Sequence, residues 1–234
     1  FNALEVVDNS VVVTAACKMC RLCVKKCKNH EIEYIDEAVS VDKSKWKGIC
    51  VYVDHENGEI HPVTYELIGK ARELAKKINH PVYALFVGCG VRINANELLY
   101  YGVDEVHVYD RPQFEGFQIE PYTAAFEHFI LKMQPSVILV GATPIGRQLA
   151  PRVAARFGTG LTADCTVLDI LKNTDLIQIR PAFGGNIMAQ IVTPKHRPQM
   201  ATVRYKVMNA PERNSRQSGE IIDCDIDDDK LISK

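Results

Sequence analysis

The sequence lacks the features that would place the chain in a membrane or against nucleic acid. No apolar run approaches the roughly 20 residues that a helix needs to span a bilayer. The 28 basic side chains are balanced by 29 acidic ones, so the net charge is -1, which gives no global attraction to nucleic acid or anionic lipid. The 234 residues contain no secretory signal peptide. We therefore expect a cytoplasmic chain with neither a membrane nor a nucleic acid as its partner.

Cysteine is concentrated rather than scarce, because four of the eight cysteines lie within eleven residues. These are Cys17, Cys20, Cys23 and Cys27. Their spacing, C-x2-C-x2-C-x3-C, is the run with which bacterial ferredoxins bind a 4Fe-4S cluster. Structural zinc sites usually use two separated C-x2-C pairs, and disulfide frameworks are typical of short secreted domains, so both alternatives fit less well. The four cysteines are therefore predicted to be metal ligands.

A short internal repeat surrounds this cysteine run. Residues 3–13 align with residues 31–41 at a constant offset of 28 positions, and each copy predicts a helical turn, a strand, a tight turn and a second strand. This is the half-unit of a two-cluster ferredoxin, so we expect a matching cysteine set upstream of Phe1. In such ferredoxins the fourth cysteine serves the other cluster. Cys27 then belongs to a second cluster or closes the same one, and the prediction is one or two 4Fe-4S clusters.

From residue 46 onward, apolar strands alternate with amphipathic helices. Strands are expected at residues 48–53, 82–88, 105–109 and 137–141, followed after residue 160 by residues 160–166, 176–186, 187–192 and 199–204. Helices are expected from an N-cap at Thr64 to residue 78, and at residues 94–101, 121–133 and 144–157. The alternation predicts an α/β fold with a doubly wound parallel sheet. Three further cysteines in apolar, strand-like surroundings are expected to be buried free thiols: Cys50, Cys89 and Cys165.

The loop at residues 141–147 follows a predicted strand and opens a predicted helix. Thr143 is a plausible N-cap, and Pro144 suits the first helical position, where a backbone N–H is not needed. Doubly wound folds bind ligands at this edge of the sheet. The loop lacks the Lys-Ser/Thr of a phosphate-binding loop and the Gly-x-Gly-x-x-Gly of a dinucleotide fingerprint. The pattern favours a helix cap first and a ligand loop second, with Thr143 and Arg147 as candidate cofactor contacts.

A second candidate contact is Arg180, which precedes a proline and a Gly-Gly pair. This arrangement predicts a turn at which the backbone could approach a planar ligand. A solvated surface arginine is an equally good interpretation of the local pattern. Arg180, Phe183 and Gly184 are therefore the candidate residues in this segment.

Several longer motifs, taken together, point to one family. They are Gly141-Ala142-Thr143 with Gly146-Arg147, and the segments at residues 149–156, 159–166, 180–189 and 197–204. Through them, residues 46 to about 204 resemble the alpha subunit of electron-transfer flavoproteins. With a ferredoxin-like module in front, the chain resembles the bifurcating type found in caffeyl-CoA reductase and lactate dehydrogenase complexes.

The resemblance implies an electron-carrier subunit of an oxidoreductase complex that uses NAD. Its implied partners are an electron-transfer flavoprotein beta subunit, a dehydrogenase or acyl-CoA reductase subunit, and ferredoxin. One FAD is expected in the beta subunit and a second in a carboxyl-terminal domain of the alpha subunit. The family expectation also places an alpha-subunit arginine near the flavin N5 of the beta-bound FAD, and Arg180 is the matching position.

The chain departs from the family pattern at its end. Residues 211–234 are acidic and carry no motif for the second FAD, so we expect a linker towards a domain outside this chain. The predicted division is a ferredoxin-like α+β module at residues 1–42, the first alpha-subunit domain at 46–210, and the linker at 211–234. The alternative is an adenine-nucleotide-binding α/β regulatory module with a structural iron–sulfur cluster and no redox task.

Overall fold

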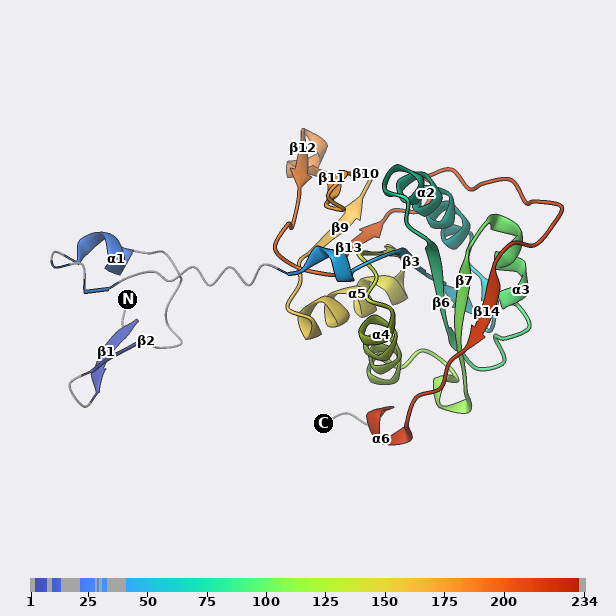
Figure 1. Ribbon diagram of the computed structural model, residues 1–234, viewed down its shortest axis with the longest axis horizontal. Coiled ribbons are helices and arrows are strands. Elements are labelled where there is room, and N and C mark those ends of the chain that lie inside the picture. Colours follow the sequence, from blue (N-terminus) through green and yellow to red (C-terminus); the bar gives the residue numbers. More distant parts are fainter. Residues whose placement is uncertain are drawn as a thin grey trace. The chain divides into compact units, whose positions relative to one another are not determined.

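A seven-stranded parallel sheet organises the larger part of the chain (Figure 1). The computed structural model describes residues 3–7, 10–13, 22–27, 29, 31–32 and 41–231. The chain divides into two units, Phe1–Val39 and Ser40–Lys234. None of the helices in the described ranges is long and apolar enough to cross a membrane.

The sheet of the second unit has the strand order β14-β7-β6-β3-β8-β13-β9, and every neighbouring pair is parallel. Its strands are β3 (Ile49–Tyr52), β6 (Val82–Gly88), β7 (Glu105–Asp110), β8 (Val137–Gly141), β9 (Leu161–Cys165), β13 (Gln199–Val203) and β14 (Glu220–Asp223). The central strands β3, β6 and β8 are buried along their whole length, as expected for strands covered on both faces. The predicted α/β fold with a doubly wound parallel sheet is confirmed.

Helices cover both faces of this sheet. They are α2 (Pro62–Ile78), α3 (Ala95–Leu98), α4 (Ile119–Met133), α5 (Pro144–Arg156) and α6 (Asp228–Leu231), with short 3-10 helices η1 (Lys43–Lys45), η2 (Leu99–Tyr101) and η3 (Pro112–Phe114). The buried faces of α2 and α3 contribute to one apolar core. Those of α4 and α5 contribute to a second core on the other face. Alternate residues of each central strand point into the two cores.

A helix cap and one cysteine of this unit differ from the sequence prediction. Helix α2 begins at Pro62 with His61 as its N-cap, not at Thr64, whose buried hydroxyl instead accepts a hydrogen bond from Asp54 N–H at 3.1 Å. Cys50 and Cys165 are buried as expected, but Cys89 is exposed. Cys89 follows the last residue of β6, where the chain has left the sheet.

The chain after β13 crosses to the opposite edge of the sheet. There, residues 220–223 form β14 beside β7, and α6 follows it. The sequence pattern indicated only an acidic linker at residues 211–234, since charged residues interrupt the apolar ones. Whether the chain divides functionally at residues 42, 46 and 210 stays a prediction.

Two small antiparallel sheets complete the second unit. One pairs β4 (His55–Glu56) with β5 (Glu59–Ile60). The other contains β10 (Val167–Ile170), β11 (Leu176–Ala182) and β12 (Ile187–Ile191), with the 3-10 helix η4 (Phe183–Gly185) at the β11–β12 turn. Strands β11 and β12 project beyond the main sheet at the top of Figure 1.

The first unit contains an antiparallel hairpin and a short helix. Strand β1 (Leu4–Val7) pairs with β2 (Ser10–Val13), as predicted for the first copy of the repeat. The second copy, residues 31–41, lies almost entirely outside the described residues. Helix α1 (Leu22–Lys26) overlaps the cysteine run.

Candidate functional site

Two of the four clustered cysteines fall in the described part of the chain, whereas Cys17 and Cys20 lie outside it. Cys27 follows α1, and its N–H donates to the Cys23 carbonyl at 3.0 Å. Residues four apart on a helix lie on one face, so Cys23 and Cys27 share a side of the helical turn. Both are half-buried free thiols.

The donor chemistry of this pair suits iron–sulfur ligation, which uses cysteine thiolates. Among the residues that the structure describes, no three His, Cys, Asp or Glu side chains are grouped to hold a metal ion. The 4Fe-4S assignment of Cys17, Cys20, Cys23 and Cys27 stays a prediction.

In the loop after β8, the Thr143 side chain forms hydrogen bonds within the domain. The Thr143 hydroxyl accepts from Gly146 N–H at 3.0 Å and donates to the Asp54 carboxylate. A Cβ on Gly146 would lie 1.9 Å from the Gly141 carbonyl oxygen, so only glycine allows this approach of helix to strand. The predicted cap at Thr143 is thus the role seen here.

Arg147 is also engaged within the domain. Its Nε donates to the Ala142 carbonyl at 2.9 Å, and its Nη2 lies 3.1 Å from a carboxylate oxygen of Asp164. Asp164 adopts a φ of 58°, a left-handed conformation that a residue other than glycine rarely takes. Contact of Thr143 and Arg147 with a cofactor stays a prediction.

The start of α5 offers little to an anionic ligand. Helix N-termini attract phosphate because of their free N–H groups and the helix dipole. Here the buried carboxylate of Asp54 lies at that end, hydrogen-bonded to Thr143. A cavity of about 510 Å³ adjoins the same place, and its lining includes Asp54, Glu56, Glu59, His55 and His61. Three carboxylates around one cavity repel a phosphate.

Arg180 lies within strand β11, opposite Ala189 of β12, rather than at the turn itself. It is half-buried, and its Nε donates to the neighbouring Pro181 carbonyl at 3.4 Å. Within the described ranges no carboxylate forms an ion pair with it, in contrast to Arg147. The guanidinium of Arg180 is therefore partly exposed to solvent and carries no ion pair in the described part of the chain.

The turn beyond Arg180 presents apolar side chains to solvent. Phe183 is 82% exposed, and Ile187 and Met188 are 55% and 52% exposed. Positive φ values at Phe183, Gly184 and Gly185, of 47°, 70° and 93°, fold the chain sharply here. A Cβ on either glycine would meet nothing within 4 Å, so their backbone conformation, not crowding, calls for glycine. Contiguous exposed apolar side chains are typical of an interaction surface.

The end of β9 lies near this arginine. Burial raises the pKa of the Cys165 thiol to about 11, and the positive charge of Arg180 acts in the opposite direction. Cys165 adjoins Asp164, which pairs with Arg147. The fold therefore brings Arg147 and Arg180 to the surroundings of one strand end, whereas the cysteine run belongs to the other unit.

A buried ion cluster supports the base of the β10–β11 turn. Asp175 accepts from Lys43 Nζ at 2.8 and 2.9 Å and from Arg197 Nη2 at 2.8 Å. The Arg197 side chain is fully buried, and that of Asp175 is 4% exposed. The cluster ties the segment that enters the second unit to the root of the strand that carries Arg180.

Sequence reasoning missed three aspartates that shape these surroundings. Asp54 could have been found, because it directly follows the predicted strand at residues 48–53, at the edge where doubly wound folds bind ligands. Asp164 and Asp175 gave no such signal. Their roles depend on a positive φ and on residues that are distant in sequence.

Known proteins match most of the chain. Residues 49–229 match the family described as the electron transfer flavoprotein domain. A subunit of lactate dehydrogenase (NAD(+),ferredoxin), LctC of Acetobacterium woodii, is 59% identical over 234 residues, which is 100% of this chain and 56% of that protein.

Two further relatives share the flavoprotein part. The electron transfer flavoprotein alpha subunit of Thermoanaerobacterium thermosaccharolyticum is 44% identical over 191 residues, covering 81% of this chain and 58% of that protein. Protein FixB of Rhizobium meliloti is 39% identical over 185 residues, covering 77% and 52%. The chain thus spans about half the length of the curated relatives it matches.

Proposed function

The chain belongs to the electron transfer flavoprotein family, and on that premise we propose that it carries electrons in a flavin-based bifurcating or confurcating dehydrogenase complex. In this proposal it is an alpha-type subunit that passes electrons between ferredoxin, a 4Fe-4S cluster and FAD, with NAD as the other electron carrier. The supporting observation is the extent of similarity. The family match begins at residue 49, whereas the match to the relative named for NAD(+) and ferredoxin covers the whole chain, cysteine run included.

The cysteine run would hold the cluster. A 4Fe-4S cluster accepts and donates single electrons, a task that suits exchange with ferredoxin. Cys23 and Cys27 supply two thiols from one helical turn, and Cys17 and Cys20 would supply the others. Whether Cys27 serves this cluster or a second one is part of what the iron content would decide.

Arg180 would act on the flavin of a beta-type partner. Its guanidinium has no carboxylate partner in the described part of the chain, and the neighbouring Phe183, Ile187 and Met188 are exposed. A beta-type partner that covers this apolar surface would bury the Arg180 guanidinium against its flavin. A fixed cation stabilises negative charge on a reduced flavin. Phe183 and Gly184 would form part of the same contact.

The nucleotide-module alternative has less support. It needs an anion site at the carboxyl edge of the sheet, and the carboxylate of Asp54 lies at the start of α5, beside a cavity lined by further carboxylates. The chain is also similar, across the cysteine run, to a relative whose name includes ferredoxin. A module with no redox task does not explain that similarity.

The test is made on the complex of this protein with its beta-type and dehydrogenase partners, purified without oxygen. We expect a 4Fe-4S electron paramagnetic resonance signal that appears when reduced ferredoxin is added and disappears when NAD⁺ and the reduced organic substrate of the dehydrogenase partner are supplied together. A cluster whose signal ferredoxin does not change would refute the electron-carrying role. Absence of iron would refute the cluster.

The role of Arg180 is tested in the same complex by measuring the reduction potential of the partner's flavin. In Arg180→Ala, loss of one charge-assisted contact of about 1.5–3 kcal/mol would make the partner's flavin harder to reduce by about 30–60 mV for a two-electron couple. Arg216→Ala, which removes an exposed arginine from the loop between β13 and β14, is the matched control. An unchanged flavin potential in Arg180→Ala would refute this assignment.

A further inference from the structure

A cysteine outside the metal-binding run lies against a histidine on the α4 face of the main sheet. Cys224 directly follows β14, and its Sγ lies 3.7 Å from Nδ1 of His107 on β7. The other ring nitrogen of His107, Nε2, lies 2.9 Å from a carboxylate oxygen of Glu105. His107 is 1% exposed and Cys224 is half-buried. Thiol, imidazole and carboxylate thus follow one another in a line of hydrogen-bonding contacts.

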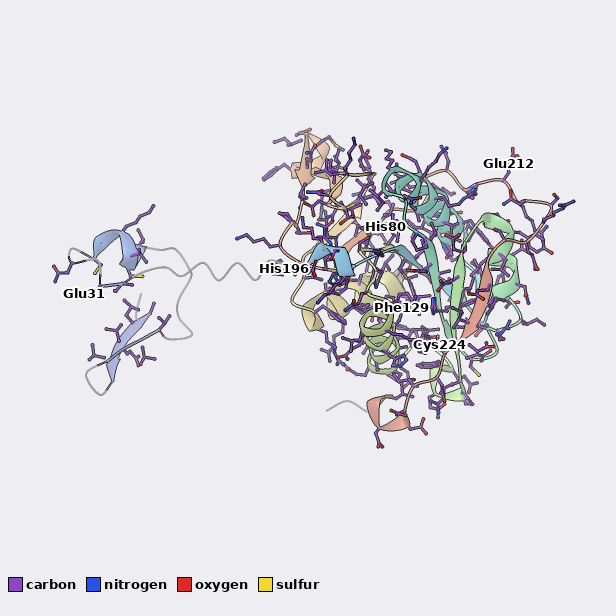
Figure 2. The ribbon with its side chains drawn as sticks, in the orientation of Figure 1. Glu31, His80, Phe129, His196, Glu212 and Cys224 are labelled. Atoms are coloured by element: carbon purple, nitrogen blue, oxygen red, sulfur yellow. The ribbon has the colours of Figure 1, made fainter. Side chains whose placement is uncertain are left out.

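The strand register explains why these three side chains meet. Glu105 and His107 are two residues apart on β7, so they point to the same face of the sheet. The Cys224 N–H donates to the Val108 carbonyl at 2.8 Å, which continues the ladder between β14 and β7 by one residue. Figure 2 labels Cys224 and Phe129. Phe129 belongs to the core on the α4 face, Cys224 packs against that core, and the ring centroids of Phe129 and His107 are 5.0 Å apart.

A nucleophile next to a base that a third group orients is the general form of an activated side chain. Nδ1 of His107 can accept the thiol proton, since Nε2–H is directed to Glu105. The carboxylate then stabilises the imidazolium that forms. Cysteine reactivity also requires access and positive surroundings. Cys224 is partly accessible, and Lys132 of α4 provides a positive charge nearby.

The resting state of the pair is neutral. Burial raises the pKa of Cys224, while the charge of Lys132 and a hydrogen bond from the Tyr109 hydroxyl act against that rise and Asp223 adds to it. Burial lowers the pKa of His107, against the pull of Glu105, with smaller effects of Lys132 and Glu220. A neutral imidazole is the form that accepts a proton, so the thiolate forms as the reaction proceeds and not beforehand.

We propose that Cys224 is a thiol–disulfide exchange site for low-molecular-weight disulfides, with His107 as its base and Glu105 as a positioning residue. His107 takes the thiol proton as Sγ attacks one sulfur of the disulfide. A bond forms between Sγ and that sulfur, the original S–S bond breaks, and the departing thiolate takes the proton from His107. The products are a mixed disulfide on Cys224 and one small thiol. The added group lies directly after the edge strand β14.

Other cysteines of the second unit provide internal comparisons. Cys50 and Cys165 are fully buried and report loss of the fold if they react. Cys89 is exposed and, within the described ranges, makes no hydrogen bond to an imidazole, so it reports reaction of a thiol that has access but no base.

The test uses the full chain, kept without oxygen and treated at pH 7 with 2-hydroxyethyl disulfide, a neutral probe that the local charges neither attract nor repel. Peptide mass spectrometry follows each cysteine separately. We expect Cys224 to exchange at a rate of the same order as Cys89 although it is less exposed. His107→Gln should slow the exchange at Cys224 by about 100-fold, and Glu105→Gln by about 10-fold. The rate at Cys89 should not change.

Glu105→Gln keeps the test decisive if His107→Gln does not fold, because the Glu105 side chain is 27% exposed. Its matched control is Glu220→Gln. Glu220 is the residue opposite Glu105 in the register of β14 and β7, and within the described ranges its carboxylate forms no hydrogen bond to His107. We expect less than a twofold change there. The proposal is overturned if Cys224 exchanges only as slowly as Cys50, or if Glu105→Gln leaves its rate unchanged.

Discussion

The two units of the chain differ in the interactions that can stabilise the fold of each one. The second unit has an apolar core on each face of its sheet, with fully buried side chains such as Phe126 and Leu67. In the first unit, none of the side chains that the structure describes is buried, and Val6, Val11 and Val13 of the hairpin are 75%, 57% and 61% exposed.

This difference indicates two sources of stability. Burial of apolar surface offsets the conformational entropy lost on folding, and the second unit has that source on both faces of its sheet. The described residues of the first unit do not. Small domains without a sufficient core usually depend on metals or disulfides, and Cys23 and Cys27 are free thiols. The comparison therefore leads us to expect a first unit that depends on the proposed cluster and a second unit that does not.

Removal of iron should have the largest effect and would break the comparison if it failed. Chelation under reducing conditions is expected to unfold the first unit completely, because binding of the proposed cluster would supply its folding free energy. Amide hydrogen exchange would show full loss of protection in β1 and β2 within seconds, with β3 and β6 still protected. Cys23→Ser should reproduce this result, whereas Cys89→Ser, at an exposed thiol of the other unit, should not. Retained protection in β1 and β2 without iron would contradict the dependence on metal.

A cavity in the second unit should have the next largest effect. Phe126 of α4 is fully buried, with its ring 5.2 Å from that of Tyr52, and Phe126→Ala should lower the free energy of unfolding by about 3–5 kcal/mol. The only tryptophan, Trp46, packs against the same core, so its fluorescence in a denaturant titration reports this unit alone.

The control for that measurement is Leu131→Ala on the same helix. Leu131 is 65% exposed, and its loss should change the free energy by less than about 0.5 kcal/mol. The iron content of the first unit should be the same in both variants. Loss of iron in Phe126→Ala at temperatures where Trp46 still reports a folded state would show that the two units are coupled.

The sequence allowed most of the sheet to be predicted because its central strands are continuous apolar runs, as at residues 82–88 and 137–141. It did not indicate β14, because only two adjacent isoleucines lie between Glu220 and Asp223, and this short edge strand is defined by its pairing with β7. The candidate site likewise contains one feature that the local sequence predicts and one that it does not. Thr143 could be predicted as a cap from its local pattern, whereas the link between Thr143 and Asp54 spans 89 positions and leaves no local signal.

The smallest expected effect concerns Lys43, in the 3-10 helix η1 where the chain enters the second unit. Burial raises the pKa of Asp175, but hydrogen bonds from Lys43 and Arg197 outweigh it and hold the pKa below its ordinary value of 3.8. A carboxyl group with a lowered pKa stabilises the fold fully above about pH 4, and this contribution is lost as the pH falls towards the folded-state pKa. Lys43→Met leaves the pair of Asp175 with Arg197 in place, so the loss should be about 1 kcal/mol.

Trp46 fluorescence in denaturant titrations at pH 7 and at about pH 3 would measure this contribution. We expect the difference in stability between the unsubstituted protein and Lys43→Met to be present at pH 7 and smaller at the acid pH, since protonation of Asp175 weakens the pair in both. Lys45→Met, at an exposed lysine of the same 3-10 turn, should change stability less at either pH. If the difference in stability were equal at both pH values, the packing of the Lys43 stem, and not its charge next to Asp175, would be what stabilises η1 against the rest of the second unit.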